Sequence, residues 1–90
     1  MAIQYTQTLI SLKRLVEKQP CETLTKIIKT ENDNAGALIL ALCSMENRSE
    51  ILRKLQHSKQ LRLLKSLTNL QQPPDFVVQV VLESLQSKLS

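Results

Sequence analysis

Residues 31–45 read ENDNAGALILALCSM, and this stretch decides the fold. After a polar opening, apolar or small residues fill every side of a helix with 3.6 residues per turn, and Asp33 or Asn34 is suited to cap its start. A helix that is apolar all round must be covered by other elements, so we expect it at the centre of the protein. Its lone glycine, Gly36, is expected to allow close helix packing, because one glycine does not supply the run of backbone amides of a phosphate loop.

Two amphipathic helices are predicted before this central segment. The stripe of the first consists of Tyr5, Leu9, Leu12 and Val16, which recur at helical spacing. The apolar side of the second consists of Leu24, Ile27 and Ile28. Pro20 separates the two, because proline ends one helix and is tolerated at the first position of the next.

Residues 50–70, EILRKLQHSKQLRLLKSLTNL, predict two more helices. Asn47 stands three residues before Glu50, which is capping-box spacing, so a helix is expected over about 48–57. If that helix continued to Leu70, its apolar side would drift around the axis, and a break near Ser58 removes the drift.

The closing stretch, residues 71–90, reads QQPPDFVVQVVLESLQSKLS. Two prolines and Asp75 precede a broad apolar face formed by Val77, Val78, Val81, Leu82, Leu85 and Leu89. The valines weaken helix propensity, but the helical spacing continues to Leu89 and no second strand is present to pair with this segment. We therefore predict a helix.

These segments predict an all-α protein, a compact bundle of five or six short helices. Short connections favour roughly three antiparallel α-hairpins, arranged either as a helical-repeat-like array or as a six-helix bundle. With 90 residues, of which 42% are hydrophobic, the chain is expected to form a single domain spanning 1–90 around one aliphatic core.

The composition argues against several classes of function. The single histidine, two distant cysteines and scattered acids match no metal site, cofactor motif or catalytic constellation, so we expect no enzyme, cofactor or small-molecule substrate. The longest uncharged stretch, 34–45, is too short for a transmembrane helix, which needs roughly 20 residues. Without a secretory signal and with Cys21 and Cys43 as a lone pair, an intracellular protein, cytoplasmic or nuclear, is expected.

The basic residues between positions 48 and 65 have two interpretations. The first is the solvated side of two packed helices, with Arg53, Lys54, Arg62 and Lys65 opposite the leucines. The second is a positive strip that follows a phosphate backbone. That strip would consist of Arg48, Arg53, Lys54, Lys59, Arg62 and Lys65. No aromatic residue stands nearby to stack on bases, so the first interpretation is favoured.

Taken together, the sequence favours a protein–protein interaction or assembly module. The C-terminal helix is the favoured contact element, because its apolar face is wide for the last helix of a small bundle. The alternative, that this face merely closes the core, carries slightly more weight. The candidate partner-binding residues are Val78, Leu82, Leu85 and Leu89. They would meet a protein partner or a second copy of the chain, and nucleic-acid binding through the basic strip is the alternative.

Overall fold

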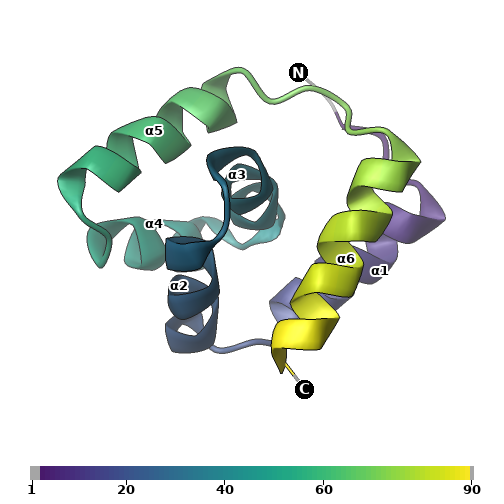
Figure 1. Cartoon of the computed structure of the whole chain (residues 1–90), viewed down its shortest axis with the longest axis horizontal. Coiled ribbons are helices and arrows are strands. Elements are labelled where there is room, and N and C mark those ends of the chain that lie inside the picture. Colours follow the sequence, from purple (N-terminus) through teal and green to yellow (C-terminus); the bar gives the residue numbers. More distant parts are fainter. Residues whose placement is uncertain (1–2, 90) are drawn as a thin grey trace.

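The computed structural model describes residues 3–89, in which six helices and no strands are found (Figure 1). The helices are α1 (Gln7–Glu17), α2 (Cys21–Thr30), α3 (Asp33–Leu42), α4 (Met45–Arg53), α5 (His57–Thr68) and α6 (Asp75–Leu89). The links between them are short, and the longest is the segment 69–74 before α6. The predicted all-α class and number of helices are confirmed, and the valine-rich closing segment is a helix.

Three of these helices begin with a polar side chain that caps the N-terminus. Thr6, Asn32 and Ser44 cap α1, α3 and α4. The hydroxyl of Ser44 accepts a hydrogen bond from the backbone N–H of Asn47 at 3.2 Å, so α4 begins three residues earlier than the spacing of Asn47 and Glu50 predicted. Likewise Asn32, one residue before the expected pair, caps α3 by accepting from the N–H of Ala35 at 2.9 Å. Both differences arise because neighbouring Ser and Asn residues are all competent caps, and the sequence alone does not rank them.

The helix α3 is central, as predicted. Its buried residues are Gly36, Ala37, Leu38, Ile39, Leu40 and Leu42. A Cβ atom added at Gly36 would lie 2.9 Å from Cδ2 of Leu63 in α5 and 3.5 Å from Cγ2 of Ile28 in α2. The glycine therefore permits the close helix contact that the sequence indicated.

Most of the packing joins helices that are not consecutive in the chain. The most extensive contact is between α3 and α5, followed by α1 with α6 and α2 with α4, and α1 and α2 also touch α3. Figure 1 shows α1 and α6 side by side at one end of the molecule. Among consecutive helices only α2 and α3 make an appreciable contact, so the expected α-hairpins are not the main packing units. The capping residue before each of α1 to α5 has extended backbone, as helix N-caps generally do.

The predicted apolar sides of α1 and α2 form part of the core, with one exception. The buried residues are Leu9, Leu12, Val16, Leu24, Ile27 and Ile28. Tyr5 was assigned to the same stripe, but it precedes α1 and is about half exposed. Because Thr6 caps the helix with extended backbone, the helical spacing does not reach back to Tyr5.

Candidate functional site

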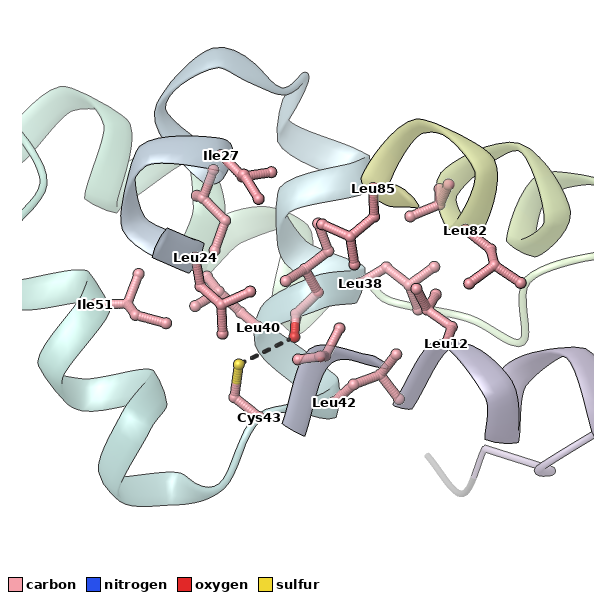
Figure 2. Packing of buried hydrophobic residues seen from close by; sticks show 14 of the residues in the cluster. Leu12, Leu24, Ile27, Leu38, Leu40, Leu42, Cys43, Ile51, Leu82 and Leu85 are labelled. Carbon is pink, nitrogen blue, oxygen red and sulfur yellow. Dashed lines mark hydrogen bonds between the residues drawn. The ribbon is translucent and has the colours of Figure 1, made fainter. Parts of the chain in front are cut away.

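The predicted partner-binding face of α6 lies mostly inside the protein. Val78, Leu82 and Leu85 are buried in the core, and Leu89 is partly buried against it. Figure 2 shows Leu82 and Leu85 directed toward Leu12 of α1 and Leu38 of α3. This wide apolar face packs against α1. Its three buried side chains therefore offer no surface to a partner.

A different side of α6 is exposed and apolar. Phe76 is 72% exposed and Val80, one helical turn further on, is 61% exposed. Both residues lie on the side of α6 opposite to Leu82 and Leu85. Sequence reasoning missed them because it followed the broad face alone, although the four-residue spacing of Phe76 and Val80 already placed a second apolar stripe on the helix.

These two side chains border a groove of about 750 Å³ between α3, α5, the segment 69–74 and α6. We call it the α3–α6 groove. Its apolar lining consists of Ala35, Leu38, Leu70, Pro73, Pro74, Phe76, Val77, Val80 and Val81. The volume falls in the range of a ligand site, and the lining is apolar enough to receive a side-chain cluster from another protein.

The rim of the α3–α6 groove is rich in amides. Asn34, Asn69 and Gln71 line it, and among the described residues Lys65 is the only charged one in its lining. Side-chain amides both donate and accept hydrogen bonds, so this rim suits the backbone of a bound segment.

One wall of the groove, the segment 69–74, is held in place at its middle and at its C-terminal end. The amide of Gln72 pairs with the backbone of Gln4: its Oε1 accepts from the N–H at 2.6 Å and its Nε2 donates to the carbonyl at 2.9 Å. At the C-terminal end of the segment, the carbonyl of Pro74 accepts from the N–H groups of Val77 and Val78 in α6. The wall is therefore fixed between the N-terminal segment and the start of α6.

Two of the six cations in the predicted basic strip serve the fold. The guanidinium of Arg48 donates to the carbonyls of Leu40, Ala41 and Cys43 at 3.0–3.3 Å, where it satisfies the end of α3. The ammonium of Lys59 donates to Oδ1 of Asp33 at 2.8 Å and to the carbonyl of Glu31 at 2.9 Å. These two side chains connect helices and are largely withdrawn from any partner.

The remaining four cations lie on exposed surfaces. Arg53 and Lys54 both pair with Glu50, and Arg62 pairs with Asp33 at 3.1 Å. Hydrogen bonding from Lys59, with added attraction from Lys59 and Arg62, lowers the pKa of Asp33. Lys65 has no ion pair within residues 3–89. This arrangement matches the solvated side of two packed helices.

Among the residues that the structure describes, the titratable groups are dispersed. Within residues 3–89, no three His, Cys, Asp or Glu side chains are close enough to hold a metal ion. Burial raises the pKa of the Cys43 thiol to about 11, and its Sγ donates to the carbonyl of Ile39 at 3.3 Å (Figure 2). His57 is exposed at the start of α5. In the same range of residues, no helix has the length and apolar character needed to cross a membrane.

A known protein family matches most of the chain. Residues 21–90 match the family described as the FliG middle domain. The match begins at the first residue of α2, so it includes α2 to α6 and leaves α1 outside. No match was found among the curated proteins or among the solved structures.

Proposed function

The chain belongs to the FliG middle-domain family, and from this premise we propose that it is a non-enzymatic protein-interaction module whose α3–α6 groove receives an apolar segment of a protein partner. Domains of this family are helical and take part in protein–protein interactions of the flagellar motor switch. On this proposal the chain works inside the cell as part of a protein assembly such as the flagellar motor switch. Residues 1–90 act in it as a single domain.

The observation that carries the proposal is the exposure of Phe76 and Val80 beside the groove. An aromatic side chain that is 72% exposed loses much of the stabilisation that burial gives, which is about 1.5–3 kcal/mol for a fully buried Phe. An apolar cluster bordered by polar residues is typical of a protein interaction site. A partner that covered Phe76 and Val80 would gain most of that energy.

The form of the groove also supports a protein occupant. Its apolar floor would hold two or three side chains of the partner, while the amides of Asn34, Asn69 and Gln71 would pair with the partner's backbone. Arg48 and Lys59, which would have to reach phosphates in a nucleic-acid complex, are instead bonded to α3 and to the segment before it. A protein partner, unlike a nucleic acid, would contact both the apolar floor and the amide groups of the groove.

The test is binding to purified flagellar motor switch proteins from the source organism. We expect the wild-type chain to bind at least one of them, and Phe76→Gln/Val80→Gln to weaken that binding about tenfold or more. Met45→Gln is the matched control, because Met45 is an exposed apolar residue on α4 that does not line the groove. Circular dichroism checks that all variants stay folded. Equal binding by wild type and the groove variant would overturn the proposal.

A further inference from the structure

The net positive charge of the chain comes from one part of the fold. Residues 45–68, which include α4 and α5, contain six Lys and Arg against two Glu, an excess equal to the net charge of +4 carried by the whole chain. The other helices and links are therefore neutral as a group. A charge confined in this way gives the molecule one attractive side for an acidic partner.

Two leucines are exposed within this basic region. Leu61 is 54% exposed and Leu64 is 45% exposed, whereas Leu63 between them is fully buried and packs on α3. At a spacing of three residues, Leu61 and Leu64 share the outward side of α5. The inward side of α5 is formed by Leu63, with Leu67 partly buried against the core, and Leu64 lies outside it.

Cations lie beside these leucines on the same helix. Lys65 and Arg62 follow Leu64 and Leu61 around the helix, and both are exposed. We call the surface formed by Leu61, Arg62, Leu64 and Lys65 the α5 outer face. It shares Lys65 with the α3–α6 groove, but neither leucine lines that groove.

We propose that the α5 outer face docks an acidic amphipathic helix of a protein partner. The leucines would pack against apolar residues spaced three or four apart on that helix, and the cations would face the acids that flank them. This surface is additional to the one in the proposed function, because it adjoins the α3–α6 groove at Lys65 but presents its own apolar residues, Leu61 and Leu64. The protein would then connect two partner segments.

Charge complementarity and the exposed leucines together select this occupant. A nucleic-acid backbone would use the cations but would leave Leu61 and Leu64 without apolar partners. It would also have to form its phosphate contacts without Arg48 and Lys59, which are engaged inside the fold. An acidic helix with an apolar stripe satisfies both features of the surface at once.

The experiment uses a synthetic helical peptide of about 18 residues, blocked at both ends, with leucines on one stripe and glutamates beside them. A second peptide has lysine in place of every glutamate. Fluorescence anisotropy with the full chain measures affinity at low and moderate salt. We expect saturable binding of the acidic peptide that weakens with salt, and no saturable binding of the basic peptide.

Four variants separate the contributions. Leu61→Gln/Leu64→Gln is expected to weaken binding of the acidic peptide about tenfold or more, and Lys65→Glu to weaken it several-fold with a smaller salt dependence. Lys26→Glu makes the same change of charge at an exposed position of α2 and is the matched control, expected to have little effect. Phe76→Gln/Val80→Gln should leave peptide binding intact, which separates this proposal from that for the groove.

Several results would overturn the proposal. One is equal binding of the peptide by wild type and Leu61→Gln/Leu64→Gln. Another is an equal loss for Lys26→Glu and Lys65→Glu, which would indicate attraction by net charge alone. The third is tighter binding to short duplex DNA, or to vesicles containing phosphatidylglycerol, that depends on Lys65 and not on the leucines. That result would assign the surface to phosphates.

Discussion

Replacing Leu85 by alanine tests whether the broad face of α6 is core or contact surface. Leu85 is 1% exposed, and removing a buried leucine side chain to the β-carbon costs about 2–5 kcal/mol, since a cavity is left as well as a loss of apolar burial. A domain of this size has a total unfolding free energy of about 5–13 kcal/mol. The substitution is therefore expected to remove a large part of the stability.

The assay is urea unfolding followed by circular dichroism. With a denaturant slope of about 1 kcal/mol/M, the midpoint of Leu85→Ala should fall by about 2 M or more. Phe76→Ala on the exposed side of the same helix is the matched control and should change the free energy of unfolding by no more than about 0.5 kcal/mol. If Leu85→Ala cost less than Phe76→Ala and instead weakened partner binding, the assignment of this face to the core would be refuted.

Three further substitutions or treatments probe the rest of the fold. Gly36→Ala should leave the free energy of unfolding nearly unchanged, because a gain in helix propensity of about 1 kcal/mol is offset by the displacement of Leu63. The larger side chain of Gly36→Val should lower the free energy of unfolding, measured in urea, by about 1–3 kcal/mol. The pKa of Asp33 is lowered in the fold, so its ion pairs stabilise the protein at pH values above the ordinary pKa near 3.8, and this stabilisation is lost as pH falls through the folded-state pKa. The difference in urea midpoint between wild type and Asp33→Asn should therefore narrow in acid, and a difference that stays constant with pH would contradict this prediction. The native Cys43 thiol, with its pKa raised to about 11 by burial, should react with iodoacetamide at mildly basic pH far more slowly than the partly exposed Cys21, and equal rates before unfolding would show that the end of α3 is open.

Local pattern in the sequence was sufficient for the helices and for most of the core. The apolar spacing of Leu9, Leu12 and Val16 reports one face of a helix whatever packs on it, because the spacing follows from helix geometry alone. The same holds for the central position of α3, since a helix with no polar side has to be enclosed. The prediction that Gly36 allows close helix packing also holds, because a residue without a side chain leaves room for a neighbouring helix.

Tertiary packing alone decided which surfaces remain for a partner. The sequence could count the apolar residues of α6 but could not show that α1 covers Leu82 and Leu85 while Phe76 and Val80 stay exposed. It likewise showed Arg48 as one cation among six, whereas its guanidinium closes the end of α3. Exposure and hydrogen bonding between distant segments depend on how helices far apart in the chain meet, and the 3.6-residue periodicity of a single helix contains no information about that.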